Sequence, residues 1–384
     1  MTTTLPQPSA QAIAHSTELC ELIRHDIARQ GGWIPFSRFM ELALYAPALG
    51  YYTAGARKFG EAGDFITAPE LSSLFGRTVA RQLIEVMQLS APHILELGAG
   101  SGKLALDILL ELEQQNQLPE SYSILEVSAD LRERQQALLQ AKIPHLVSRV
   151  EWLDALPESF SGGVLGNEVL DALPVHLVHW LNGQVFERGV ALEGERFVWQ
   201  NRVPENAALI EFAQTVEVPD DYLSEVSFAA RGLISSLCER INLGAMLFID
   251  YGFGAREYYH PQRSRGTLMC HYRHHAHDDP FYLPGLQDVT AHVDFTAIAE
   301  AAIDHGGHFL GYTSQAHFLF NNGLADFLAE VSPEEVKAYA PHSAQVQKLT
   351  SPAEMGELFK VIALGKGLDQ PLAGFLRGDL SRLL

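Results

Sequence analysis

Residues 93–103 read HILELGAGSGK, the most informative stretch of the chain. Its apolar beginning predicts a short buried strand, and three glycines follow at alternate positions, Gly98, Gly100 and Gly102. Glycine has no Cβ and tolerates positive φ, so a strand that ends in this run can turn sharply and admit a ligand close to its backbone. The apolar residues within 104–109 then favour a helix that packs back onto the strand. We therefore expect a ligand at the start of this helix.

The spacing of the glycines distinguishes two kinds of nucleotide ligand. A dinucleotide site has the order G-x-G-x-x-G, whereas here Lys103 holds the third glycine's place and Gly102 precedes it. Glu96 precedes the first glycine, and E-x-G-x-G-x-G resembles motif I of class I S-adenosylmethionine (SAM) methyltransferases. A second acid, Glu126, closes the next expected strand, residues 123–126, where a ribose-binding carboxylate should stand. Glycines and acids together favour SAM over NAD, with a purely structural tight turn as the alternative.

The first 90 residues read as a helical region with a loop that covers a site. We expect residues 1–15 to be disordered and the first helix to be capped by Ser16. The expected helices are 16–29, 35–44 and 71–89. Residues 47–70 are too polar for a core and too rich in aromatic side chains for a linker. Loops of this composition often cover a binding site.

Five passages, in order, resemble the MidA family of SAM-dependent methyltransferases: GYY, FGEAGDFITAPELSSLFG, ILELGAGSGKLALDIL, LGNEVLDALPV and LPGLQDVTAHVDF. The resemblance covers roughly residues 22–365, and the combination of GDF-x-T-x-PE with NE-x-LDALP is specific to this family. The family includes the mitochondrial arginine methyltransferase that assists complex I assembly. The mitochondrial members carry a targeting sequence that is missing here, so this chain resembles the bacterial members.

The resemblance implies an α/β fold of the class I SAM-methyltransferase kind, with a Rossmann-like seven-stranded sheet. A helical N-terminal region precedes the sheet, and insertions follow strands 4 and 5. We expect residues 1–90 to form the N-terminal region and residues 91–384 the methyltransferase core, with insertions at about 181–228 and 253–295. Asn182-Gly183, between alternating segments, is a strong hairpin signal. This hairpin is either a platform for a protein substrate or purely structural.

The expected cofactor site draws residues from several loops. The glycines and Glu96 would hold the methionine end of SAM and Glu126 its ribose, while acids and a threonine of the N-terminal loop would enclose it. In methyltransferases the loop after the third strand borders the adenine, so Asp154 either accepts a hydrogen bond from its amine or begins a turn as an exposed carboxylate. The expected cofactor-binding residues are Glu96, Gly98, Gly100, Gly102, Glu126, Asp154, Asn167, Asp64, Thr67 and Glu70.

Two acids follow the fourth strand, Glu168 and Asp171, within NEVLDALP at 167–174. Ligands of open α/β sheets bind at the carboxyl ends of the strands, beside the switch point in strand order, so both acids should lie near the SAM methyl group. Methyl transfer to a guanidinium depends mainly on orientation and electrostatics, and a carboxylate can bind that planar group bidentately. We assign catalytic roles to both acids, with Glu168 orienting the acceptor. The alternative is that Asp171 caps a turn and Glu168 is a solvated loop acid.

Two further stretches carry polar residues toward the expected crevice. The fifth strand ends in Asp250 and Tyr251, which we expect to open toward it, with a simple strand end as the alternative. The passage DVTAHVDF at 288–295 matches the family loop, which makes Asp288 and His292 minor candidates.

The favoured function is methyl transfer from SAM to a protein side chain, above all arginine. By resemblance the partner protein includes a respiratory-complex subunit, and a homodimer stays open. One alternative is a small-molecule methyltransferase. Another is a SAM-binding assembly factor that binds a partner without turnover. An NAD oxidoreductase ranks below these because the third glycine is missing.

Composition narrows the choice of partners and compartment. Forty-seven acids against 27 bases give a formal net charge of −20, which repels nucleic-acid phosphates, so we expect no nucleic-acid partner. No apolar run approaches the roughly 20 residues of a membrane span. The three cysteines have no metal or redox spacing, and the N-terminal MTTTLPQPSAQ has neither a secretory nor a transit pattern. We therefore expect a cytoplasmic protein.

Residues 271–279 contain four histidines and two aspartates. Their spacing matches no closed metal site, and the positive charge of Arg273 would oppose a cation there. We expect no metal. A pH-sensitive lid and a plain surface loop remain open as uses of this segment.

Overall fold

The computed structural model describes residues 5–54 and 67–384. The chain forms two compact units, each assembled from separate segments. The first unit contains residues 1–65, 171–231 and 255–294, and the second contains residues 66–170, 232–254 and 295–384. The helix expected over 71–89 therefore groups with the second unit.

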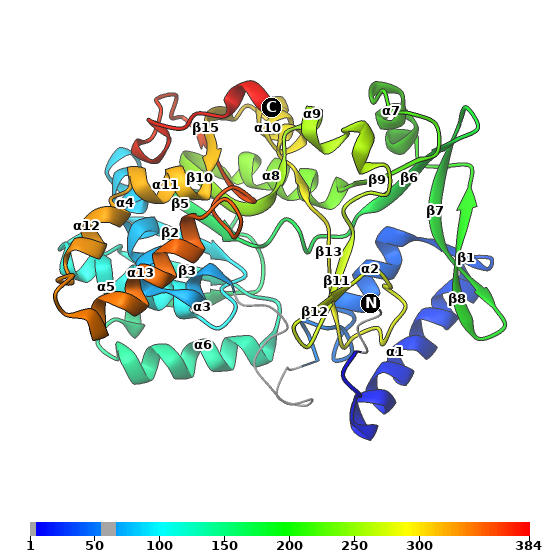
Figure 1. The fold of residues 1–384 in the computed structure, drawn as a ribbon, viewed down its shortest axis with the longest axis horizontal. Helices are drawn as coiled ribbons and strands as arrows, with labels where there is room; N and C mark the ends of the chain where they lie inside the picture. The colour runs from blue at the N-terminus through cyan, green and yellow to red at the C-terminus, as the bar shows by residue number, and fades with distance from the viewer. Residues whose placement is uncertain (1–4, 55–66) are drawn as a thin grey trace. The chain divides into compact units, whose positions relative to one another are not determined.

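The second unit is built on a mixed sheet whose main path runs β15-β16-β10-β5-β2-β3-β4 (Figure 1). The strands are β2 (His93–Leu97), β3 (Ser121–Leu125), β4 (Val150–Leu153), β5 (Phe160–Asn167), β10 (Ile241–Phe253), β15 (His308–Ser314) and β16 (Phe359–Lys366). Strands β4, β3, β2, β5 and β10 pair in parallel, and β16 runs antiparallel to both β10 and β15. This is the class I methyltransferase sheet that the sequence predicts. The strand order reverses at β2 and β5, which places the switch point between them.

The first unit combines the N-terminal helices with the segments that follow β5 and β10. Its main antiparallel sheet has the order β1-β7-β6-β9, with β8 paired to β7. The larger elements are α1 (Ala10–Arg29), β1 (Trp33–Pro35), α2 (Phe36–Tyr45), β6 (His176–Leu181), β7 (Gln184–Glu193), β8 (Arg196–Arg202), α7 (Ala207–Thr215) and β9 (Tyr222–Val226). The shorter ones are α9 (Ala255–Tyr258), η3 (Pro261–Arg263), β11 (Met269–Tyr272), β12 (His275–His277), β13 (Asp288–Thr290) and β14 (Val293–Asp294).

The predicted hairpin at Asn182-Gly183 is confirmed. Leu181 pairs with Gln184 across the turn, and φ is 53° at Asn182 and 70° at Gly183. Positive φ at both central residues is the type I′ pattern, whose twist matches that of the flanking strands.

The beginning of the chain differs from the prediction. Helix α1 starts at Ala10, and its N-cap is Ser9, whose hydroxyl accepts a hydrogen bond from the Ala12 amide at 3.2 Å. Ser16 is buried and donates to the carbonyl of Pro284 at 2.9 Å, so it is not the cap. The expected disorder through residue 15 is therefore wrong, because contacts with residues far along the chain order this turn.

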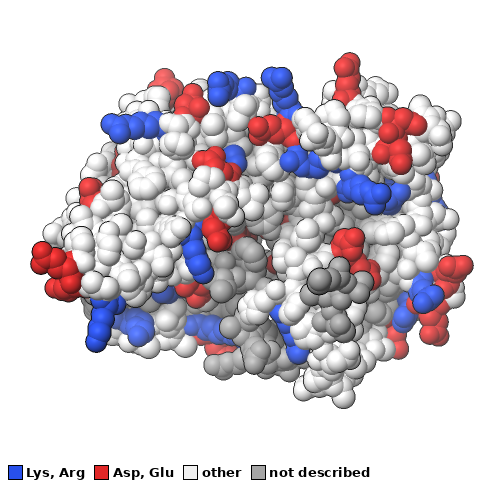
Figure 2. Space-filling view, viewed as in Figure 1, with Lys and Arg blue, Asp and Glu red and all other residues white. Residues whose placement is uncertain are grey.

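The surface carries both signs of charge. On the face drawn in Figure 2, acidic and basic side chains are interspersed. Within residues 5–54 and 67–384, no helix has the combination of length and apolar character that crossing a membrane needs.

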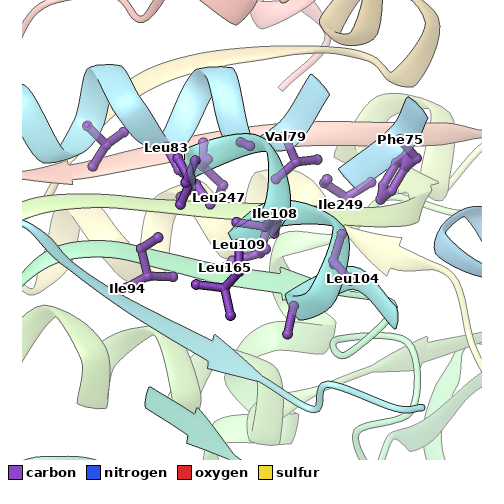
Figure 3. Packing of buried hydrophobic residues seen from close by; sticks show 14 of the residues in the cluster. Phe75, Val79, Leu83, Ile94, Leu104, Ile108, Leu109, Leu165, Leu247 and Ile249 are labelled. Carbon is purple, nitrogen blue, oxygen red and sulfur yellow. The ribbon is translucent and has the colours of Figure 1, made fainter. Parts of the chain in front are cut away.

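The core of the second unit lies between the sheet and its helices. The helices are α3 (Ala68–Leu71), α4 (Ser73–Leu89), α5 (Lys103–Gln114), α6 (Ala129–Lys142), α10 (Phe295–Asp304), α11 (Gln315–Asn321), α12 (Leu324–Ala329) and α13 (Val336–Thr350), with α8 (Phe228–Arg240) leading into β10. Phe75, Val79 and Leu83 form one stripe of α4 at a spacing of four and pack toward strand residues such as Leu165 and Leu247 (Figure 3). Each fully buried side chain of this size contributes about 1.5–3 kcal/mol, which fixes the strand ends that carry the site.

Candidate functional site

The glycine run forms an open turn between β2 and α5. Gly98, Gly100 and Gly102 have φ values of 62°, 53° and 84°, which confirms the need for glycine, and Gly102 is the N-cap of α5. No described atom lies within 4 Å of the place that a Cβ on Gly100 would take, so the backbone there is open to a ligand. The first amides of α5 carry a partial positive charge and suit a carboxylate.

Glu96 is a buried carboxyl at the end of β2. Its Oε2 accepts a hydrogen bond from the Tyr122 hydroxyl at 2.8 Å. Burial raises the pKa of Glu96 to about 7, against the lowering effect of the Tyr122 hydrogen bond, and the negative charge of Glu126 adds to the rise. At neutral pH Glu96 is poised between its two forms, and a cationic group placed beside it would favour the ionised one.

Glu126 directly follows β3 and is also buried. Its Oε1 accepts from the Ser128 amide at 3.0 Å and its Oε2 from the Gln135 side chain at 3.1 Å. Burial raises the pKa of Glu126, while those two hydrogen bonds and the charge of Arg132 lower it. The carboxylate is thus held in one orientation at the carboxyl end of β3, as a ribose-binding acid would need to be.

Sequence reasoning missed Gln135, which lies on α6 with no exposed surface. It stands one turn before the buried Leu139, so an amide on the apolar stripe of an amphipathic helix was the available signal.

Asp154 lies at the surface. Its side chain is 92% exposed and pairs with Arg132 at 2.8 Å. This is the exposed carboxylate of the alternative interpretation. In this arrangement its charge is already paired.

The N-terminal loop reaches the glycine turn through Glu70. The Glu70 carboxylate accepts a hydrogen bond from the Ser101 hydroxyl, within the turn itself. Thr67 is half-buried at the N-cap of α3. Asp64 lies outside the described residues.

The end of β5 carries Asn167 and Glu168. The Asn167 amide nitrogen donates to Oε1 of Glu168 at 3.2 Å, and its Oδ1 is buried with no hydrogen-bond donor among the described residues. Glu168 has a φ of 53°, a left-handed conformation that costs a non-glycine residue about 1–3 kcal/mol and recurs at functional sites. Its amide donates to the Ile249 carbonyl at 2.9 Å, which ties the turn to β10.

Asp250 holds this turn from the neighbouring strand. It is fully buried, and its Oδ2 accepts from the amides of Val169 at 3.2 Å and Leu170 at 2.9 Å. Its Oδ1 accepts from the Tyr251 amide at 3.0 Å. The expectation that Asp250 opens toward the crevice is wrong, because its oxygens satisfy backbone donors instead.

The other acids expected near the acceptor belong to the first unit. Asp171 is buried, and its carbonyl accepts from the Ala291 amide at 3.0 Å. Asp288 accepts from the Tyr52 hydroxyl at 2.9 Å, and His292 is half-buried.

The histidine-rich segment is a hairpin of β11 and β12 rather than a loop. Arg273 and His274 form its turn, with φ values of 47° and 63°. Within the described parts of the chain, no group of three or more His, Cys, Asp or Glu side chains is arranged to hold a metal ion.

The second unit therefore gathers complementary groups at the carboxyl ends of β2, β3 and β5. They are an open helix N-terminus, the two buried acids Glu96 and Glu126, the buried oxygen of Asn167, and Glu168. This set fits the carboxylate, ammonium and ribose hydroxyl groups of SAM.

Comparisons with known proteins identify the same cofactor. Residues 78–313 match the family model Methyltransf_28, described as an S-adenosyl-L-methionine-dependent methyltransferase. A crystal structure from Burkholderia thailandensis, of a COG1565 superfamily member bound to S-adenosyl-homocysteine (SAH), has a TM-score of 0.95 and 48% identity. That similarity covers 99% of this chain and 100% of the other.

Two curated relatives extend the similarity to named enzymes. The Mus musculus mitochondrial protein arginine methyltransferase NDUFAF7 is 31% identical, over 91% of this chain and 86% of its own length. Its Drosophila melanogaster homolog is 30% identical, over 96% and 91% respectively.

Proposed function

We infer that this chain, which belongs to the Methyltransf_28 family and is a SAM-dependent methyltransferase with the class I fold, methylates an arginine side chain of a partner protein. Family, fold and cofactor follow from the comparisons, and the acceptor is our proposal. It is supported by relatives named protein arginine methyltransferases that align over most of both chains.

The observation that carries the proposal is the position of Glu168. Its turn packs beside the glycine turn, since a Cβ added to Gly98 would lie 3.5 Å from Cγ2 of Val169. The strained backbone of Glu168 and its hydrogen bond from Asn167 fix the carboxylate at this point. A carboxylate so held can bind a guanidinium bidentately and turn one nitrogen toward the methyl donor.

The residues of the chain would act mainly by orientation and charge. SAM supplies an electrophilic methyl carbon on its sulfonium. Glu168 would hold the guanidinium in line with that carbon, so that the new N–C bond forms as the S–C bond breaks. The nitrogen loses one proton in the process, and the Glu168 carboxylate is the nearby acceptor that we propose for it.

The cofactor contacts are proposals as well. Glu96 would face the ammonium of the methionine moiety, the α5 N-terminus its carboxylate, and Glu126 the ribose hydroxyls. Buried Oδ1 of Asn167 is a further acceptor for a donor of the cofactor or the guanidinium, because a buried oxygen without a partner costs about 1–3 kcal/mol.

Glu168→Gln tests the acceptor assignment. We expect it to retain SAH affinity and lose at least about 100-fold in methyl transfer, because the amide cannot pair with a guanidinium or take its proton. The assay incubates the protein with labelled SAM and a lysate of its own organism, and mass spectrometry locates the modified residues.

The control is Glu113→Gln, on α5, where Glu113 pairs with His145 at 2.8 Å at the surface. It should transfer at the wild-type rate. Wild-type transfer by Glu168→Gln would overturn the assignment, and methylated small molecules in place of arginine would overturn the acceptor class. The labelled peptide also tests whether the partner is a respiratory-complex subunit.

A further inference from the structure

One buried side chain connects three segments of the cofactor site. The Nε2 atom of Gln135 donates to the Gly100 carbonyl at 2.9 Å and to Oε2 of Glu126 at 3.1 Å. Its Oε1 accepts from Nε1 of Trp152 at 2.9 Å. Both amide hydrogens and the amide oxygen are therefore used.

These partners fix which way the amide points. Rotating it by half a turn would place Oε1 against the Gly100 carbonyl and the Glu126 carboxylate, and Nε2 against the indole N–H of Trp152. Each of those contacts would join like with like, so only the observed orientation satisfies all three.

The contact also includes close packing. A Cβ on Gly102 would lie 3.1 Å from Cγ and 3.2 Å from Cα of Gln135, so α6 rests directly on the glycine turn. The three bonded segments follow or form β2, β3 and β4, which are the segments expected at the methionine, ribose and adenine parts of SAM.

We propose that Gln135 is a positioning residue for SAM binding: it holds the glycine turn and the Glu126 carboxylate in the geometry that receives the cofactor. It acts through its partners and need not touch SAM. Without it, the buried Glu126 oxygen and Trp152 N–H would lose their partners, and the free site would lose order that binding must then restore. The inference rests on the proposed ribose contact of Glu126, and it is independent of Glu168.

The test is calorimetric titration with SAH of the full chain carrying Gln135→Met. Methionine preserves length and volume but removes all three hydrogen bonds. We expect SAH to bind about 10- to 100-fold more weakly, which corresponds to the loss of one or two hydrogen bonds to a charged group.

Gln82→Met is a matched control. Gln82 is likewise fully buried, donates to a carboxylate, Oε2 of Glu85, at 2.6 Å, and accepts from a glycine amide, Gly374, at 2.8 Å. It also packs against that glycine, 2.6 Å from the place of an added Cβ. Its loss should lower the unfolding temperature as much as that of Gln135 and leave SAH affinity within twofold of wild type.

A double-mutant cycle separates positioning from general destabilisation. If Gln135 acts through Glu126, then Gln135→Met should cost much less affinity in a Glu126→Gln background than alone. If Gln135→Met does not fold, Gln135→Glu replaces it; this variant keeps the Trp152 acceptor, cannot donate while ionised, and should also bind SAH at least 10-fold more weakly.

Three results would overturn the inference. They are SAH affinity within twofold of wild type in the folded variant, an equal loss in Gln82→Met, and full additivity with Glu126→Gln. Failure of the Glu168 assignment would show in transfer alone, with SAH affinity unchanged, so the two proposals fail separately.

Discussion

Glu96 shows how one residue can trade stability for ligand binding. A carboxyl with almost no exposed surface and one hydroxyl partner is poorly placed to carry a charge, and this is why its pKa rises to about 7. Such a group is an expensive part of the core unless a cation arrives beside it. Perturbed acids of this kind mark functional sites more often than purely structural ones.

The stability cost of Glu96 should depend on pH. Below about pH 4.5 the carboxyl is protonated in both the folded and unfolded states and has no effect; between about 4.5 and 7 the unfolded chain releases the proton first, so stability falls as pH rises. Glu96→Gln, which can still accept from Tyr122, should therefore gain stability relative to wild type over this range, on the order of 3 kcal/mol above pH 7. Urea unfolding of both proteins at pH 4.5 and pH 8 measures this difference, and a difference that does not change with pH would contradict it.

At the scale of elements, the turn after β5 depends on its neighbour β10. Asp250 supplies acceptors for the amides of Val169 and Leu170, and the Ile249 carbonyl takes that of Glu168. The strained conformation of Glu168 persists because these bonds over-determine it.

Asp250→Asn should loosen this turn while keeping the side chain's size. One carboxylate oxygen becomes an amide nitrogen that cannot accept, so we expect a loss of about 1–3 kcal/mol in stability and a fall of about tenfold or more in methyl transfer. SAH affinity should stay within about threefold of wild type, as the turn serves the acceptor. Kinetics and calorimetry on the same preparation measure both quantities.

Glu111→Gln is the control for that variant. Glu111 is buried on α5 and pairs with Arg77 at 2.7 Å, away from the turn. Its loss should destabilise the protein without affecting transfer. If transfer falls equally in both variants, then Asp250 matters only for folding.

The elements that sequence predicts well are those with local signals. The glycine turn, the Asn182-Gly183 hairpin and the α4 stripe depend on φ preferences and periodicity within a few residues, and all are confirmed. The roles of Ser16 and Asp250 depend on Pro284 and on a turn about 80 residues away, which no local pattern reveals. Long-range polar contacts are therefore what the sequence could not supply.

For the whole molecule, the family resemblance carried the sheet order and the cofactor, and both are confirmed. The cofactor half of the site can be read from one compact unit, residues 66–170, 232–254 and 295–384. Of the expected site residues, Asp154 is exposed and ion-paired, Asp171 belongs to the other unit, and Gln135 went unnoticed because its role comes only from tertiary packing.

The most direct test of the account is a calorimetric titration of SAH into the purified, folded protein and into Gly100→Val. The open turn at Gly100, with a φ of 53°, is where we expect the cofactor to meet the backbone, and valine would both strain that φ and fill the space. The account predicts saturable one-site binding by the wild type and at least about 100-fold weaker binding by the variant. Equal affinity in the two proteins, or no heat from the wild type at millimolar SAH, would contradict it.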